Sequence, residues 1–439
     1  MFSPLYTAEE LRAAEQGHDV EAMMERAGRA VADSVLRRYP EAERIVAICG
    51  KGANGGDGRI ALRALAAAGR KTSEQLDDGA DVVIDALFGT GFHGQPRAEA
   101  AREIERINAA NAPVVAVDLP SGVDASTGEV AGAAVDADVS VTMHGPKVGL
   151  AVAPGRFHAG DVEVADLGLE PGETRNALVT EEILRTVPRK QAHDTKYTAG
   201  SVLVVGGAPG MTGALCLAAE AAFRADAGYV AVAVPAESLP VVEVRLLEPV
   251  KAPLERAGEL AERATALALG PGLGRGDEER ALVRRLLAEV RLPAVVDADA
   301  LHELEPGEWP APRVLTPHAG EVARLLGVES GWVDAHRLEA VRRAADRFRC
   351  VVLLKGADTL VAAPGHGVLV SASGTPALAA AGTGDVLTGV VAALLAKGLD
   401  ARIAAAAAAF AHGRAAELVA HQRGVIASDL LATLPQALG

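Results

Sequence analysis

A short segment near the end of the chain combines an anion-binding backbone with an acidic side chain. Gly382, Thr383, Gly384 and Asp385 directly precede the apolar run Val386–Leu395, which predicts a helix. Backbone N–H groups at the start of such a helix form a pocket for an anion. Asp385 could then deprotonate a hydroxyl that attacks a phosphorus atom held in that pocket. The alternative is an ordinary helix cap made by Thr or Asp between two glycines.

Four further segments in the second half of the chain could contribute to the same site. Lys355–Thr359 lies between two expected strands and could bind a nucleotide, and Gly270–Gly274 follows another strand. Thr316–Glu321 opens an expected helix, and Gly206–Ala214 is a glycine-rich connection between a strand and a helix. A lone histidine such as His318 is more often structural than catalytic. Because His318 occurs together with these other segments, contact with a ligand is favoured over a structural role.

The first half of the chain contains its own glycine-rich segment, Gly50–Gly58. It follows the expected strand Ile45–Cys49 and precedes a helix expected from about Arg59, an arrangement that suits phosphate binding. The segment matches G-x-G-x-x-G, but no convincing strand precedes the nearby acidic residues Glu74 and Asp77. A Walker A loop is excluded because Gly-Lys-Ser/Thr does not occur. A tight turn without a ligand is the alternative.

Three more expected strands of the first half end in small or polar residues. These ends are Asp85–Gly91, Asp118–Gly122 and Met143–Lys147. Ligands of open α/β sheets bind at the carboxyl ends of the strands, so the four segments should converge on one crevice. A carboxylate there can act as a base, and a lysine can hold phosphate or donate a proton.

The elements that position these residues are strands alternating with helices along the whole chain. This pattern predicts parallel sheets with helices on both faces. The alternation pauses in the polar stretch Thr186–Gly200. We therefore expect two domains, residues 1–187 and residues 188–439.

Composition excludes several classes of protein. The net charge of −15 over 439 residues disfavours nucleic-acid binding. No signal peptide is visible, and the longest apolar run, Ile403–Ala411, is too short to span a bilayer. Three distant cysteines indicate reduced thiols, and no zinc or calcium motif occurs. We therefore expect a cytoplasmic protein with no membrane or nucleic-acid partner.

The first half resembles the NAD(P)H-hydrate epimerase family. The shared features are Met24–Gly28, the Asn54–Gly58 segment, Asp85–Gly91, Val117–Gly122 and Pro146–Leu150. The resemblance implies a Rossmann-like three-layer domain, a potassium ion held by Asn54, Asp85 and Ser121, and Asp118 as the acid/base, with Lys147 as its electrostatic partner. The implied contacts to the hydrated nucleotide are Ala53, Asn54, Gly55, Gly56, Asp57, Gly89, Thr90, Gly91, Phe92, His93, Gly94, Gln95, Asp118 and Lys147.

Two features of the first half depart from the pattern of that family. Ala53 stands where the family has a second Asn. Only the short stretch Arg70–Ala80 separates the first expected helix from the next strand, so we expect the sheet to be one βα unit short.

The second half, from about His193, resembles the ADP-dependent NAD(P)H-hydrate dehydratase family, which has a ribokinase-like fold. The resemblance implies phosphorylation of the hydrate hydroxyl by ADP, with Mg²⁺ accompanying the nucleotide and Asp385 as base. The implied hydrate contacts are Ala214, Gly272, His318 and Asp385, and the implied ADP contacts are Lys355, Gly356, Ala357, Asp358, Thr359, Thr383 and Gly384.

Taken together, the two halves predict a bifunctional repair enzyme that forms a homo-oligomer. The epimerase would interconvert the R and S hydrates, and the dehydratase would consume the S form. One alternative is a ribokinase-like kinase for a small alcohol, with a non-catalytic nucleotide-binding first domain. Another keeps the dehydratase but treats the first domain as a binding or assembly module.

Overall fold

The computed structural model describes residues 1–170 and 172–439, which form two compact units. The N-terminal unit comprises Pro4–Asn176 and Asp334–Leu338, and the C-terminal unit comprises Met1–Ser3, Ala177–Val333 and Glu339–Gly439. The change of unit thus falls before the position near residue 187 that the sequence suggested. The reason is that β8 (Asn176–Val179) pairs with the C-terminal sheet, and Ile183 and Leu184 pack in the core of that unit.

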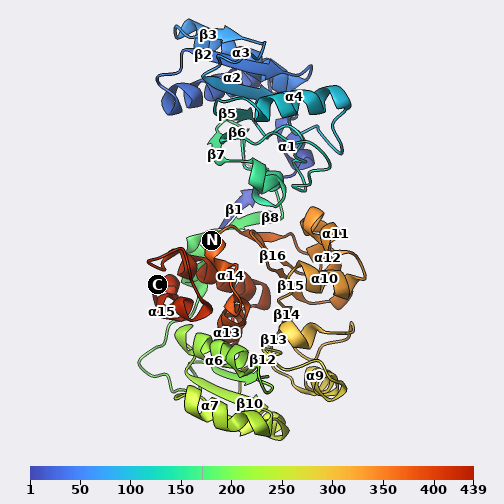
Figure 1. Ribbon diagram of the computed structural model, residues 1–439, viewed down its shortest axis with the longest axis vertical. Helices are drawn as coiled ribbons and strands as arrows, with labels where there is room; N and C mark the ends of the chain where they lie inside the picture. The colour runs from blue at the N-terminus through green and yellow to red at the C-terminus, as the bar shows by residue number, and fades with distance from the viewer. Residues whose placement is uncertain (171) are drawn as a thin grey trace. The chain divides into compact units, whose positions relative to one another are not determined.

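The N-terminal unit contains a six-stranded parallel sheet of order β3-β2-β4-β5-β6-β7 (Figure 1). Its strands are β2 (Arg44–Cys49), β3 (Lys71–Ser73), β4 (Val82–Ala86), β5 (Val114–Val117), β6 (Val139–Met143) and β7 (Asp161–Ala165). Its helices are α1 (Ala8–Glu15), α2 (Val20–Arg38), α3 (Ala53–Ala67), α4 (Ala98–Asn108) and α5 (Val148–Ala151), with the 3₁₀ turn Gly155–His158.

Alternate residues of these strands face two separate cores. Ile45 and Ile84 pack against α2 and α3, whereas Val46 and Val83 pack against Ile104 and Ile107 of α4. The continuous apolar runs of β2 and β4 therefore reflect burial on both faces, as is typical of parallel sheets. The three-layer architecture expected from the sequence is confirmed.

The short stretch between α3 and β4 retains a strand but contains no helix. Lys71–Ser73 forms β3 at the edge of the sheet, in parallel register with Arg44–Val46. The expectation that a whole βα unit is missing is therefore only half right. The acidic Glu74 does follow a strand, and its carboxylate accepts a hydrogen bond from Arg59 Nε (3.2 Å).

The glycine-rich segment of the first half is largely helical. Helix α3 begins at Ala53, with Gly52 as its N-cap, rather than at about Arg59. The glycines serve close packing, since a Cβ on Gly55 would lie 2.0 Å from the carbonyl oxygen of Gly50. Asn54 and Asp57 are consequently held on the first turns of a helix instead of on a loop.

The C-terminal unit contains an eleven-stranded sheet of order β1-β8-β17-β16-β15-β14-β13-β12-β9-β10-β11. The strands from β11 to β15 pair in parallel, and β16 is antiparallel to both β15 and β17. The remaining bounds are β1 (Phe2–Leu5), β9 (Ser201–Val205), β10 (Tyr229–Val234), β11 (Val250–Pro253), β12 (Ala266–Leu269), β13 (Ala294–Val296), β14 (Arg313–Leu315), β15 (Val351–Leu354), β16 (Thr359–Ala362) and β17 (Leu369–Ser371).

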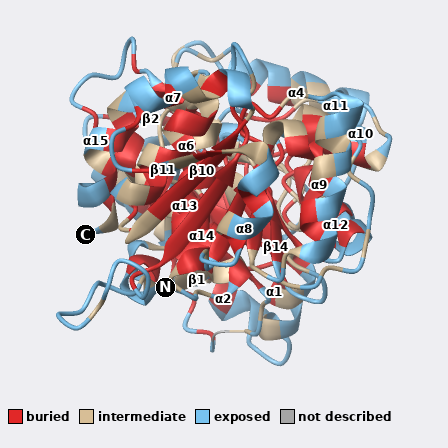
Figure 2. Cartoon of the chain, turned by 90° about the horizontal axis from the view of Figure 1, so that it is seen from below, coloured by how far each residue is buried: buried red, intermediate tan, exposed pale blue. Residues whose placement is uncertain are grey.

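Ten α-helices flank this sheet in the described part of the chain, and α13 and α14 are its most buried helices (Figure 2). The helices are α6 (Thr212–Arg224), α7 (Leu239–Arg245), α8 (Ala257–Ala261), α9 (Asp277–Glu289), α10 (Ala319–Leu326), α11 (Ser330–Ala335), α12 (Arg337–Phe348), α13 (Thr383–Ala396), α14 (Ala401–Glu417) and α15 (Ala427–Leu438). Shorter 3₁₀ turns are Glu181–Thr186, Ala236–Ser238, Leu254–Arg256, Ala298–Leu301 and Pro376–Leu378. None of the helices in residues 1–170 and 172–439 is both long and apolar enough to cross a bilayer.

Helix α13, which carries Asp385, packs closely on α6. A Cβ on Gly389 would lie only 2.1 Å from the carbonyl oxygen of Ala218, so the backbones of the two helices meet at this glycine. The approach holds α13 against α6.

We predict that Gly389→Ala destabilises the C-terminal unit by about 1–3 kcal/mol through overpacking. The gain in helix propensity, about 1 kcal/mol, has the opposite sign and is outweighed by the clash with a backbone atom. Urea unfolding measures the difference. The control is Gly258→Ala in α8, because Gly258 is helical and a Cβ there would meet nothing within 4 Å. A Gly389→Ala variant as stable as this control would contradict the prediction.

Candidate active sites

A cavity of about 990 Å³ lies in the N-terminal unit at the carboxyl ends of β2, β4, β5 and β6. Of the expected hydrate contacts, those lining this cavity are Ala53, Asn54, Asp57, Gly89, Thr90, Gly91, Phe92, His93, Gln95, Asp118 and Lys147. Gly55, Gly56 and Gly94 are not among the lining residues. The structure thus brings together segments that lie far apart in the sequence, as the strand-end pattern predicted.

Asp118 is held at the end of β5 by several donors. Its backbone takes a positive φ of 72°, and its side chain forms a short ion pair with Lys147 Nζ. The amide of Met143 and the hydroxyl of Thr142 also donate to Asp118 Oδ1 (3.0 and 3.3 Å). Lys147 donates a second hydrogen bond to the carbonyl of Met143 (2.8 Å) and is almost completely buried. The carboxylate is therefore fixed and paired.

Asp85 and Ser121 lie outside the lining of the cavity and are both buried. Ser121 donates to the Asp85 carboxylate through its backbone N–H and through its hydroxyl, both at 2.7 Å. Burial raises the pKa of Asp85 to about 6, and the hydrogen bonds from Ser121 and Leu87 oppose the rise. Asn54 Nδ2 donates to the carbonyl of Phe88 (2.8 Å), whose amide donates to the Ser121 hydroxyl (2.9 Å). The three expected potassium ligands thus belong to one connected network.

The candidate site of the C-terminal unit is built on four neighbouring parallel strands. Gly270, Asp297, Thr316 and Lys355 directly follow β12, β13, β14 and β15. Backbone hydrogen bonds keep these strand ends in register, from Asp297 N to Leu269 O (3.0 Å) and from Thr316 N to Val296 O (3.1 Å). The segments lie along a single edge of the sheet.

A partly buried ion pair joins two of these strand ends to α13. Lys355 Nζ donates to Asp297 Oδ1 (2.9 Å), and Thr388 Oγ1 of α13 donates to Asp297 Oδ2 (2.6 Å). Burial opposes the charge of Lys355, but attraction to Asp297, Glu321 and Asp385 outweighs it and raises the pKa of the ammonium group. A Cβ on Gly384 would lie 3.4 Å from Lys355 Nζ, so this cation adjoins the Gly-Thr-Gly backbone.

Asp385 lies in the first turn of α13, beside this ion pair. Burial raises its pKa to about 7, repulsion from Asp297 and Asp299 adds to the rise, and attraction to Lys355 opposes it. A carboxylate with such a pKa can take up a proton near neutral pH. Gly382, the N-cap of α13, has φ 90°, and no side chain caps the helix there. Thr383 N donates to Ala380 O (3.4 Å), and the N–H groups that follow it in the first turn of α13 can face an anion.

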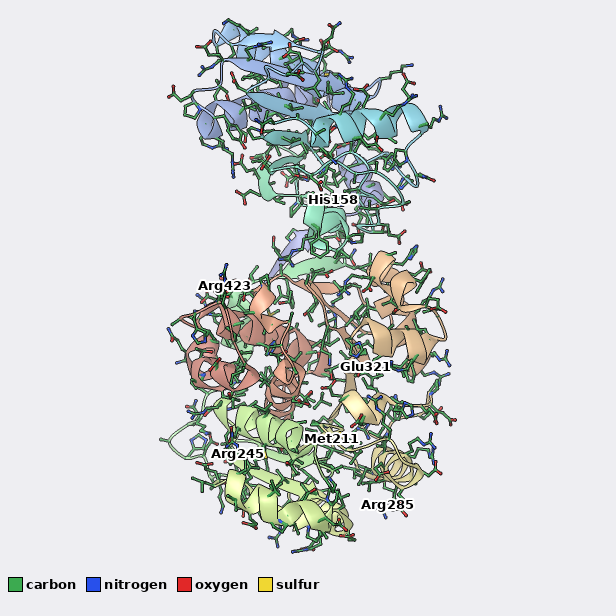
Figure 3. The ribbon with its side chains drawn as sticks, viewed as in Figure 1. His158, Met211, Arg245, Arg285, Glu321 and Arg423 are labelled. Carbon is green, nitrogen blue, oxygen red and sulfur yellow. The ribbon has the colours of Figure 1, made fainter. Side chains whose placement is uncertain are left out.

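The other expected contacts lie at the start of α10, in the β15–β16 turn and near the start of α6. His318 is the N-cap of α10, where its Nδ1 accepts a hydrogen bond from Gly320 N (3.0 Å) and its backbone N–H donates to Glu321 (2.9 Å). Figure 3 labels Glu321 in α10 and Met211, which directly precedes α6. Asp358 is fully buried in the β15–β16 turn, whereas Gly356 and Ala357 are exposed.

The loop before α6 packs against the Gly270–Gly274 segment. Ala208 N donates to Gly272 O (2.7 Å), and a Cβ on Gly272 would lie 2.4 Å from Met211 O. Ala214, on the first turn of α6, follows this loop.

Sequence reasoning missed Asp297, Thr388 and Glu15. Asp297 carried the same signal as Asp85 and Asp118, an acidic residue directly after an apolar strand. Thr388 lies inside an apolar helix, and Glu15 lies on α1, outside every strand end, so neither carried a signal. Glu15 lines the cavity of the N-terminal unit.

Comparison with known proteins assigns each half of the chain to a family. Residues 202–436 match the family model described as NAD(P)H-hydrate dehydratase, and residues 20–73 and 69–149 match the YjeF-related protein N-terminus. The chain is 38 % identical to the bifunctional NAD(P)H-hydrate repair enzyme Nnr of Moorella thermoacetica, covering 95 % of this chain and 92 % of that protein. The Escherichia coli protein of the same name is 33 % identical, covering 94 % and 88 %.

Solved structures confirm the ribokinase-like fold of the C-terminal unit. The ADP/ATP-dependent NAD(P)H-hydrate dehydratase of Bacillus subtilis, co-crystallised with ATP and Mg²⁺, is 30 % identical with a TM-score of 0.55, covering 59 % of this chain and 96 % of that one. A ribokinase-like protein of Enterococcus faecalis shares the fold, with a TM-score of 0.54 at 21 % identity. Because its similarity to the repair enzymes extends over nearly its whole length, the chain belongs to the family of bifunctional NAD(P)H-hydrate repair enzymes.

Proposed function

We propose that this protein repairs hydrated NADH and NADPH. The N-terminal unit interconverts the R and S hydrates, and the C-terminal unit dehydrates the S hydrate with ADP, giving NAD(P)H, AMP and phosphate. The observation that carries the proposal is the pair of polar sites, one in each unit, at the carboxyl ends of parallel strands, in units that match the two family models.

In the dehydratase, Asp385 takes the proton of the hydrate hydroxyl. The hydroxyl oxygen attacks the terminal phosphorus of ADP, and the bond between that phosphorus and AMP breaks. The Gly382–Gly384 backbone and the Lys355 ammonium receive the negative charge of the transferred group. Phosphate then leaves the ring carbon with its bonding electrons, and a proton is lost from the neighbouring carbon. Mg²⁺ is part of the nucleotide substrate. We also propose that Ala214, Gly272 and His318 contact the hydrate and that Lys355–Thr359 contacts ADP.

In the epimerase, the ring opens at the hydrated carbon and closes again on the other face. Opening requires that the hydroxyl loses a proton and that the ring nitrogen gains one. Asp118 is the proposed acid/base, and Lys147 supports its charge from a buried position. The first turn of α3, capped by no side chain at Gly52, offers its N–H groups to a phosphate of the nucleotide.

A potassium ion fits the Asn54–Asp85–Ser121 network. The Asp85 carboxylate is fully buried, and no cationic side chain within the described residues pairs with it. Asn54 and Ser121 add an amide and a hydroxyl oxygen, which are hard donors of the kind that such cations prefer. Bound there, the ion would neutralise Asp85 and attract the anionic nucleotide.

The comparisons favour this function over a small-alcohol kinase, because both halves match the repair enzymes in order. A kinase would release a stable phosphorylated product. The proposed homo-oligomeric state awaits measurement.

A mixture of both hydrate epimers supplied with ADP tests the two activities together. We expect nicotinamide absorbance to recover to completion, whereas a dehydratase alone stops near the fraction of S hydrate. Asp118→Ala should reproduce that early stop while leaving S hydrate consumption intact. Unchanged consumption of both epimers by Asp118→Ala would refute the role of Asp118. A lack of recovery with both ADP and ATP would refute the proposed function.

We predict that Asp385→Asn abolishes dehydration and leaves epimerisation intact. The base must be ionised, so the kcat/KM of the wild type for S hydrate should fall as the pH drops below about 7. Because the pKa of Asp385 is higher in the folded than in the unfolded chain, its ionised form destabilises the fold above this pH. The Asp385→Asn variant should therefore be at least as thermally stable as the wild type at pH 8. An acid limb near pH 4 would contradict the assignment.

Thermal unfolding tests the potassium site. At equal ionic strength, K⁺ should raise the midpoint of the N-terminal unit above its value in Li⁺, because a ligand that binds the folded state stabilises it. Asp85→Asn should remove this difference. Equal midpoints in the two salts for the wild type would speak against the site.

A further inference from the structure

Asp57 stands out among the carboxylates of the N-terminal cavity that the proposed epimerase mechanism does not use, which are Glu15, Asp57, Glu99 and Glu103. Asp57 projects from the first turns of α3, lines the cavity and is 92 % buried, with an exposed fraction of 8 %. Its Oδ1 is enclosed and finds no hydrogen-bond partner within the described residues. Asp118 across the cavity, by contrast, has Lys147, Met143 and Thr142 as donors.

The charged groups that face Asp57 come from several elements. Glu15 on α1 and Asp118 after β5 lie close enough for their charges to act on it. Lys147 lines the same cavity but pairs with Asp118. Cys49, Lys51 and His93 also line the cavity, and burial raises the pKa of the Cys49 thiol to about 11, so it is neutral.

We propose that Asp57 is a catalytic residue of the epimerase and exchanges a proton with the ring nitrogen of the hydrate. This inference rests on the proposed epimerase function of the same cavity. In the opening step, Asp118 takes the hydroxyl proton, the C–N bond breaks with its electron pair going to nitrogen, and protonated Asp57 gives that nitrogen its proton. Reclosure on the other face reverses each transfer, so the two carboxyl groups return to their starting states.

The environment of Asp57 suits a group that must both give and take a proton. Burial raises its pKa to about 7, and repulsion from Asp118 and Glu15 adds to the rise. The protonated and ionised forms are then comparably populated at neutral pH, which is the condition for efficient general acid–base catalysis. Asp118, by contrast, is paired with the buried Lys147.

The C-terminal unit repeats this arrangement with different elements. There Lys355 pairs with one buried carboxylate, Asp297, and the neighbouring Asp385 has a pKa raised to about 7. The proposed base of the dehydratase is thus the less compensated member of its pair of carboxylates. By the same physical criterion, Asp57 is the less compensated carboxylate of the N-terminal cavity and is suited to exchange a proton alongside Asp118.

The test uses the full chain with purified R hydrate and, separately, purified S hydrate, both with ADP. Asp57→Asn should slow the consumption of R hydrate, measured above its spontaneous rate, by about 100-fold or more, the usual contribution of a general acid. Consumption of S hydrate by the same sample should not change, which makes the C-terminal unit an internal control. A rate on R hydrate within about 3-fold of wild type, judged against that scale, would overturn the proposal.

The pH profile separates catalysis from a structural role. Because opening needs protonated Asp57, the wild-type kcat/KM for R hydrate should fall above about pH 7 at constant K⁺. Glu15→Gln removes a negative charge that raises the pKa of Asp57, so this alkaline limb should move to lower pH. The Glu15→Gln test leaves Asp57 intact, so it stays decisive even if Asp57→Asn fails to fold. A limb that is absent in wild type, or unmoved in Glu15→Gln, would overturn the assignment.

The thermal midpoint completes the test. Asp57→Asn removes a poorly compensated buried charge at nearly constant volume, so its midpoint at pH 8 should equal or exceed that of wild type. A lowered midpoint together with equal loss on R and S hydrates would identify Asp57 as structural and overturn its catalytic role. If the wild type itself fails to accelerate consumption of R hydrate, the epimerase function fails rather than the role of Asp57.

Discussion

A lysine paired with a buried aspartate controls the electrostatics of both sites. Removing such a pair from water costs several kcal/mol per ion unless hydrogen bonds satisfy both partners. Strand β6 provides these bonds to Asp118 through Thr142 and Met143, and helix α13 provides one to Asp297 through Thr388. Strand register, the helix that follows each strand and the glycines that let those helices approach all serve to hold the two pairs in place.

The interior of the fold could be predicted from the sequence, but its margins could not. Central strands such as Val82–Ala86 and Val351–Leu354 are continuous apolar runs, because parallel strands are buried on both faces. Edge strands carry no such pattern. Lys71–Ser73 and Asp161–Ala165 are mostly exposed and are strands only because their backbones pair with a neighbour. The edge strand β1 was missed for the same reason, whereas β8 and β17 are buried but only four and three residues long. The glycines of α3 made a helix resemble a loop.

The candidate sites were predictable where an acidic residue directly follows a strand, as for Asp85 and Asp118. The same rule would have found Asp297. The sequence could not show which of these carboxylates is best suited to exchange a proton, because that depends on partners and burial that only the fold supplies. Asp118 was the natural choice for an acid/base by position, yet the structure gives it a lysine and leaves Asp57 without a hydrogen bond at Oδ1. Glu15 affects the site only through space, from a helix that carries no motif.

The strand order of the larger sheet has a consequence for how the chain holds together. Strands β1 and β8 are neighbours in that sheet, although nearly all of the N-terminal unit lies between them in sequence. The smaller domain is therefore an insertion between the edge strand β1 of the larger sheet and its neighbour β8. Joining the ends of so long a disordered segment would cost several kcal/mol of loop-closure entropy, on the order of (3/2)RT ln n. Folding of the inserted domain already holds its two ends together, so this entropy is not lost again when β1 pairs with β8. Docking of β1 in the larger sheet is thus thermodynamically coupled to the folding of the inserted domain. A dehydratase cut out at the apparent linker would lack β1 and β8 and would leave β17 unprotected at the edge of its sheet.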